Sequence, residues 1–157
     1  MSRTAVTRIV AFGAAIVFCT GCSGGGGGGG SSSPAGPSSS GSTDLNGTWT
    51  GTAEDTTGPG SLTWKLAGSG ASFSGQLTIV DSQTGITGRG TVTVTASGSS
   101  LTFTMNVPSG GFDSPYQACT TTASGSGTLN GTITGTYSGT NSCAGAISSG
   151  TLTLNKQ

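Results

Sequence analysis

The sequence predicts an all-β protein in which a single antiparallel meander of about eight strands closes into an up-and-down barrel. Three observations lead to this prediction. From Asp44 onward, threonine or serine alternates with an apolar residue or glycine, the pattern of half-buried strands. Turn-forming sequences separate the alternating runs at short spacing, and no run has the apolar spacing of a helix. A two-layer β-sandwich is the alternative, because strand number and alternation do not distinguish closure from stacking.

The second and third of the first four expected strands show the apolar residues of a strand gathered on one face. Leu62 and Trp64 share a face of the second strand, and Phe73 and Leu77 share a face of the third. Between these strands lie three turn sequences, 57–60, 68–70 and 81–85. The expected strands are 45–54, 61–67, 72–80 and 86–96.

The last four expected strands are 101–107, 118–129, 132–140 and 146–154. Asn130-Gly131 supplies the turn before 132–140. In the last strand, Ile147 and Leu152 differ in parity, so both face inward only if a bulge lies at 148–150. Otherwise the strand begins at Thr151.

Residues 1–21 have the order of parts of a secretory signal peptide. Arg3 and Arg8 supply positive charge, Ile9 to Phe18 form an apolar run, and small residues follow. The run is shorter than the roughly 20 apolar residues of a membrane-spanning helix. We therefore expect residues 1–21 to be removed on export.

Thr20, Gly21 and Cys22 resemble the lipobox of bacterial lipoproteins, with Cys19 where that family most often has leucine. The resemblance implies that the Cys22 thiol carries lipid and that the mature protein is anchored to a membrane of the cell envelope. Ser23 after the cysteine favours the outer over the inner membrane in a Gram-negative cell. Ordinary signal cleavage after Gly21 is the alternative.

Residues 22–43 are almost entirely glycine and serine, and such a sequence buries too little apolar surface to fold. A coil of this composition spans roughly 25 Å, so we expect a flexible tether between the lipid anchor and the domain. Residues 44–157 then form one domain with a single core.

The composition of residues 44–157 argues against several functions. This part of the chain contains three basic and five acidic residues, which gives a net charge of −2, so we expect no basic surface for nucleic acid. The chain has no histidine, which excludes Ser-His-Asp triads and histidine-ligated zinc. Glu54 and Asp55 are adjacent and fit a solvated strand end better than a catalytic pair. We expect neither enzymatic activity nor a metal or cofactor.

Cys119 and Cys143 are expected to form a disulfide for two independent reasons. They are the thiols that remain if Cys19 is removed with the signal peptide and Cys22 is lipidated, and an exported pair is usually oxidised. In addition, Leu129 and Ile133 are inward-facing residues of neighbouring strands, so we expect them to lie opposite each other. This register, in which paired numbers sum to 262, sets Cys119 opposite Cys143.

The loop 108–117 is the longest connection and the best candidate for a functional surface. Phe112 and Tyr116 lie on it, and two interpretations stay open. Their rings contact a ligand or partner, or they cap the open end of the barrel.

Gly47-Thr48-Trp49 resembles the G-x-W signature that opens the barrels of lipocalins and avidins, together called calycins. The resemblance implies that Trp49 closes one end of the barrel. It also implies that a late basic residue, here Lys156, packs across that tryptophan.

Two function classes are consistent with the sequence. The first is a structural or protein-interaction module of the cell envelope, with a core filled by its own side chains. The alternative is a lipocalin-like barrel that binds a small apolar ligand among Trp49, Trp64 and Phe103, with inward glycines such as Gly51 and Gly75 leaving room. The volume of the interior discriminates between them.

We expect intact-mass measurement of the protein extracted from membranes to find a chain that begins at Cys22 and carries the added mass of lipid. The physical reason is that the thiol accepts a diacylglyceryl group before the upstream peptide is cut. A mature chain that begins at an unmodified Cys22 would refute lipidation.

Overall fold

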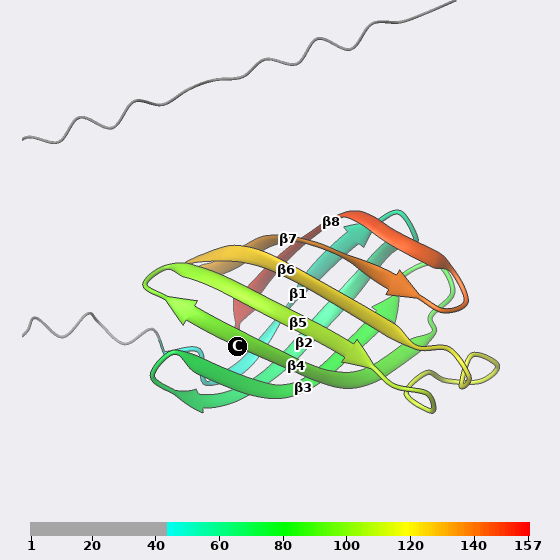
Figure 1. Ribbon diagram of the computed structural model, residues 1–157, viewed down its shortest axis with the longest axis horizontal. Coiled ribbons are helices and arrows are strands. Elements are labelled where there is room, and N and C mark those ends of the chain that lie inside the picture. Colours follow the sequence, from blue (N-terminus) through cyan, green and yellow to red (C-terminus); the bar gives the residue numbers. More distant parts are fainter. Residues whose placement is uncertain (1–43) are drawn as a thin grey trace, which may run out of the picture. The chain divides into compact units, whose positions relative to one another are not determined.

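The computed structural model describes residues 44–157, so the predicted signal peptide, Cys22 and the tether lie outside the described residues. Eight strands form one antiparallel meander that closes into a barrel (Figure 1). This confirms the predicted fold and excludes the sandwich. The strands are β1 (Gly47–Asp55), β2 (Gly58–Ser69), β3 (Ser72–Asp81), β4 (Thr87–Ser97), β5 (Ser100–Val107), β6 (Thr121–Asn130), β7 (Thr132–Asn141) and β8 (Gly145–Lys156).

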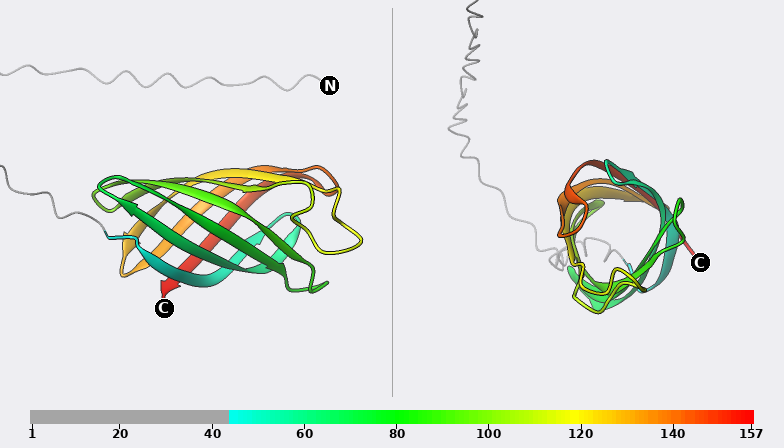
Figure 2. Two further views of the ribbon diagram at one scale, coloured as in Figure 1. Left: turned by 90° about the horizontal axis from the view of Figure 1, so that it is seen from below. Right: turned by 90° about the vertical axis from the view of Figure 1, so that its right-hand side faces the viewer.

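The barrel closes where the first strand pairs with the last. The β1–β8 register runs from Trp49 opposite Lys156 to Glu54 opposite Thr151, and β1 pairs with β2 on its other side. Figure 2 shows the resulting ring of strands in its right-hand view. Closure pairs both edges of the meander, which protects the strands from joining other chains. Within residues 44–157, the structure has no helix suited by length and apolarity to crossing a membrane.

Two strand boundaries differ from the sequence prediction by three residues, and the others differ by two at most. Residues 58–60 belong to β2 and not to a turn, because the Asp55 carboxylate accepts the Thr57 N–H at 2.7 Å and tightens the turn to two residues. Strand β6 begins at Thr121 and not at residue 118, because the Cys119 N–H bonds to the carbonyl of Tyr116 within the preceding loop.

Strand β8 contains the predicted bulge. The β7–β8 register shifts between Tyr137 and Gly139, and Ser149 opposite this shift has a left-handed φ of 55°. As a result Ile147 and Leu152 are both buried although their parities differ. The strand starts at Gly145, so the alternative start at Thr151 is wrong.

Trp49 closes the barrel at the end where the described chain begins and ends. Its ring is 2% exposed, and its Nε1–H donates to the carbonyl of Leu45 at 2.9 Å. The Nζ atom of Lys156 lies 5.7 Å from the centre of the ring. The packing of Lys156 on Trp49 that the G-x-W resemblance implied is therefore present.

Gly51 and Gly75 let the strands bend, and they do not leave the room that the sequence suggested. A methyl group at Gly51 would overlap the carbonyl oxygen of Thr153, and one at Gly75 would overlap that of Lys65. Backbone from the neighbouring strand already fills the space beside both residues. Glycine at such positions commonly marks the corners of a small barrel.

The outer wall carries hydroxyl groups in place of charges. Threonine, serine and asparagine occupy the exposed positions of β5, β6 and β7, and none of these three strands has a charged residue. Cross-strand pairs such as Thr128 and Thr134, whose Oγ1 atoms are 3.3 Å apart, link neighbouring strands. The solvent face of these three strands is therefore uncharged.

We expect Gly75→Ala to lower the free energy of unfolding by about 2 kcal/mol, because the added methyl group forces the backbone of Lys65 to move. Urea denaturation followed by far-UV circular dichroism measures the change. Ser74→Ala, at the exposed neighbouring position, is the matched control and is expected to change little. Equal stabilities for the two variants would show that the close approach at Gly75 is not a constraint.

Candidate functional site

A pocket of about 290 Å³ opens at the end of the barrel remote from Trp49. Inward-facing residues near the strand ends form its walls, and the 108–120 loop and the β7–β8 turn contribute to its rim. Its apolar lining includes Ala53, Leu62, Ile79, Ile86, Met105 and Ile147. Its polar lining includes Asp55, Asp81, Thr121, Tyr137 and Asn141.

Small inward-facing residues explain why the space remains at this end. Ala53, Gly58 and Gly60 occupy inward positions of β1 and β2 beside the pocket. At the opposite end of the same two strands the inward positions hold Trp49 and Leu66, which are buried. The barrel is therefore filled at one end and hollow at the other.

Tyr137 reaches across one strand to bond with Asp55. Tyr137 lies on β7 and Asp55 on β1, with β8 between them, yet the phenol donates to Asp55 Oδ2 at 2.7 Å. The ring crosses β8 at Gly150, where a methyl group would lie 2.6 Å from the ring atom Cε2. The bulge and this glycine together make the contact geometrically accessible.

The environment of Tyr137 favours its protonated form. Burial raises the pKa of the phenol well above its ordinary value, and the hydrogen bond to Asp55 and the negative charge of that carboxylate raise it further. The hydroxyl therefore stays a hydrogen-bond donor throughout the physiological pH range.

Asp81 places a second carboxylate on the pocket wall. Its Oδ1 atom accepts the N–H groups of Gln83 and Thr84 at 2.7 and 2.8 Å in the β3–β4 turn. The Thr84 N–H in particular lowers the pKa of Asp81, and burial opposes this only in part. The side chain is therefore ionised at neutral pH.

Thr121 and Asn141 form the polar wall beneath the disulfide. Asn141 Nδ2 donates to Thr121 Oγ1 at 2.8 Å, and Asn141 Oδ1 accepts the N–H groups of Cys143 and Ala144. Thr121 is 7% exposed. Its hydrogen bond satisfies a hydroxyl that burial would otherwise penalise.

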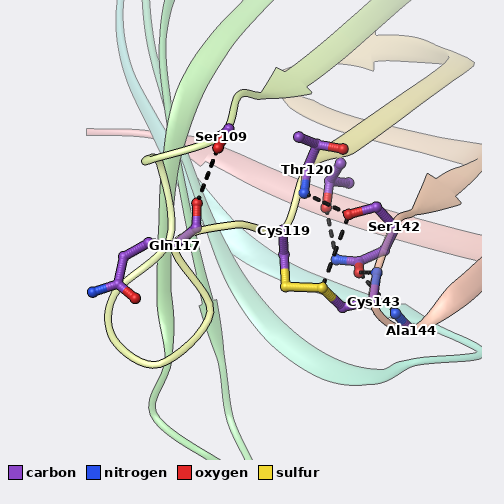
Figure 3. The surroundings of a disulfide bond; sticks show 9 residues. Ser109, Gln117, Cys119, Thr120, Ser142, Cys143 and Ala144 are labelled. Atoms are coloured by element: carbon purple, nitrogen blue, oxygen red, sulfur yellow. Dashed lines mark hydrogen bonds between the residues drawn. A yellow bond between two sulfur atoms is a disulfide. The ribbon is translucent and has the colours of Figure 1, made fainter.

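The predicted disulfide between Cys119 and Cys143 is present, with Cα atoms 5.7 Å apart (Figure 3). Both residues lie just beyond the β6–β7 ladder and keep its register, in which Thr121 faces Asn141. The Thr120 N–H donates to Ser142 Oγ beside the bond, at 2.9 Å. A link across 24 residues stabilises the fold by about 3 kcal/mol on the chain-entropy model.

The 108–120 loop is attached on two sides of the pocket. The disulfide fixes its end to the β7–β8 turn. On the other side it bonds to β4, where Arg89 N–H donates to the Gly111 carbonyl at 2.8 Å and Arg89 pairs with Asp113 at 2.7 Å. The Phe112 ring packs in the space that a side chain at Gly88 would take, with Cε1 2.6 Å from the position of its missing Cβ.

The five aromatic residues singled out from the sequence separate into two groups. Phe112 and Tyr116 line the pocket. Trp49, Trp64 and Phe103 are buried in the core and do not line it. The rings of Trp64 and Phe103 pack with centres 5.2 Å apart, and the Trp64 Nε1–H has no hydrogen-bond partner within the described structure.

Sequence reasoning missed the role of the two carboxylates. Asp55 was assigned to a solvated strand end, and Asp81 to a turn. The alternation of residues along each strand could have identified both. Asp55 lies an even number of residues from the inward-facing Trp49, and Asp81 lies an even number from the inward-facing Leu77, so each faces inward as well. Among residues 44–157, no group of three or more histidine, cysteine, aspartate or glutamate side chains is placed to hold a metal ion.

Comparison with solved structures finds two redesigned β-barrels of similar fold. One, b11L5F_LGL, is 22% identical, with a TM-score of 0.48, and the match covers 72% of this chain and 91% of that chain. The other, mFAP1, whose structure has DFHBI bound, is 23% identical, also with a TM-score of 0.48, and the match covers 71% of this chain and 94% of that chain. No protein-family model and no curated protein matches the sequence.

We expect Tyr137→Phe to lower the free energy of unfolding at neutral pH by about 1–2 kcal/mol, because a hydrogen bond to a charged acceptor is lost. The raised pKa of Tyr137 adds a pH dependence. The unfolded phenol ionises near pH 10, so its stabilising effect is complete below that pH and declines as the pH rises further.

Urea denaturation at neutral pH and at pH values above 10 tests both effects. The stability of Tyr137→Phe should decline less with alkaline pH than that of the natural protein. Tyr116→Phe, which changes a tyrosine that is 44% exposed, is the control at neutral pH. Unchanged stability of Tyr137→Phe at neutral pH would mean that the Asp55 contact contributes nothing.

Proposed function

We propose that this protein is a lipid-anchored protein of the cell envelope whose barrel binds a small apolar ligand in the pocket at its disulfide end. The pocket itself is the observation that carries the proposal. At about 290 Å³ it lies at the lower end of the range of small-molecule sites, roughly 300–1,000 Å³, which argues for a small ligand. Aliphatic side chains line its walls, with a few polar groups among them.

The closed end of the barrel supports a lipocalin-like mode of binding. Trp49 and Lys156 stack there, as the G-x-W resemblance implied, so a ligand enters from the opposite end. The binding site then lies beside Phe112 and Tyr116, and not among Trp49, Trp64 and Phe103.

The location in this proposal rests on the sequence. The lipobox-like residues ending at Cys22 support a membrane anchor, and Ser23 supports the outer membrane in a Gram-negative cell. The Gly/Ser-rich residues 22–43 supply a tether. We propose no enzymatic activity, since the histidine-free chain lacks the usual general base.

A structural or protein-interaction module is the second candidate. The observation in its favour is Tyr116, a large aromatic side chain that is 44% exposed on a loop fixed at two sides. Exposed aromatic residues on ordered loops are common contact points for protein partners.

Binding of octanol tests the proposal. The full chain carrying Cys22→Ser, which removes the predicted lipid, is titrated with octanol in an isothermal calorimeter. We expect saturable binding, and we expect Ala53→Leu to weaken it about tenfold or more because the larger side chain occupies the pocket.

Ala67→Leu, the same substitution at an exposed position of β2, is the matched control and should leave binding unchanged. Absence of saturable octanol binding, or equal binding by both variants, would exclude the pocket as the site and favour the interaction module.

A further inference from the structure

We infer that the pocket selects an amphiphile whose head group is positively charged, such as a small aliphatic amine. This inference rests on the proposed function and adds the charge of the ligand to it. It derives from three features of the lining: two carboxylates, three aromatic rings and the absence of a basic side chain.

The two carboxylates retain acceptor capacity for a ligand. Asp55 accepts from the Thr57 N–H, the Thr57 hydroxyl and the Tyr137 phenol, which occupies three of about four acceptor positions. Asp81 accepts two backbone N–H groups at Oδ1 and also interacts with the Thr84 hydroxyl, which together occupy about three of its four acceptor positions. An ammonium group, which has three donors and no acceptor, matches these vacant positions.

Aromatic side chains add to the attraction for a cation. Phe112, Tyr116 and Tyr137 all contribute to the lining. The faces of aromatic rings carry partial negative charge and attract ammonium groups, most strongly where water is partly excluded. Aliphatic walls such as Leu62 and Ile79 lower the local dielectric and so strengthen both the charge–charge and the cation–π attraction.

None of the basic residues of the described chain balances these charges within the pocket. Lys65, Arg89 and Lys156 are absent from the lining. Arg89 pairs with Asp113, and Lys156 packs on Trp49 at the other end of the barrel. An anionic amphiphile would meet two carboxylates and no cation, so a fatty acid is disfavoured on electrostatic grounds.

Three probes with the same apolar chain test the inference: octylammonium, octanol and octanoate, each titrated into the full chain carrying Cys22→Ser. We expect octylammonium to bind about tenfold more tightly than octanol, and octanoate to bind more weakly than octanol. Asp81→Asn keeps an acceptor for the turn and removes the charge. It should weaken octylammonium about fivefold and change octanol less than about twofold.

Glu54→Gln is the matched control, because it removes a charge from the same end of the barrel at an exposed residue that does not line the pocket. It should alter neither affinity. Asp55→Asn repeats the test on the second carboxylate if Asp81→Asn is unstable. Octylammonium binding no tighter than octanol, or equal effects of Asp81→Asn and Glu54→Gln, would overturn the inference. Failure of all three probes to bind would instead overturn the proposed function.

Discussion

The close approach of inward-facing glycines such as Gly51 and Gly75 to a neighbouring strand is the constraint on which the barrel depends. At Gly51 and Gly75 the neighbour's backbone fills the place of a side chain, which lets the strands coil tightly enough to close. At Gly150 the ring of Tyr137 fills it, and at Gly125 the Thr136 carbonyl and the Phe103 ring share it. In the core, large side chains thus pack over glycines, which have no side chain. The distribution of the large residues along the strands decides which end of the barrel stays open.

Much of this fold follows from strand parity. Alternation assigns each residue to the inner or outer face, and one secure pair, Leu129 with Ile133, fixes the register of a whole hairpin. The disulfide follows from that register, and the bulge near Ser149 follows from the differing parities of Ile147 and Leu152. Closure into a barrel leaves no free strand edges, and the β1–β8 ladder provides this closure, which alternation alone does not distinguish from a sandwich.

The site was harder to predict because parity gives the face of a residue and not its depth along the barrel. Trp64 and Phe103 face inward as expected, yet they fill the middle of the core, and the hollow lies further along. That depth depends on how each strand tilts and staggers, which alternation does not encode. The two pocket carboxylates have a dual role, since Asp55 and Asp81 also hold tight turns. Because both residues have the sequence pattern of turn formers, the sequence does not show that they also occupy inward-facing positions at the ends of strands.

The hydroxyl-covered outer wall bears on how the molecule responds to its ionic surroundings. From Ser100 to Asn155 the chain contains one charged residue, Asp113, and the two ion pairs of the described structure join exposed side chains. Dissolved salt weakens attraction between exposed charges, and here few such attractions contribute to the fold. Hydrogen bonds and β-branched packing between strands are nearly indifferent to ionic strength. The cohesion of the barrel is thus largely independent of the salt concentration around it.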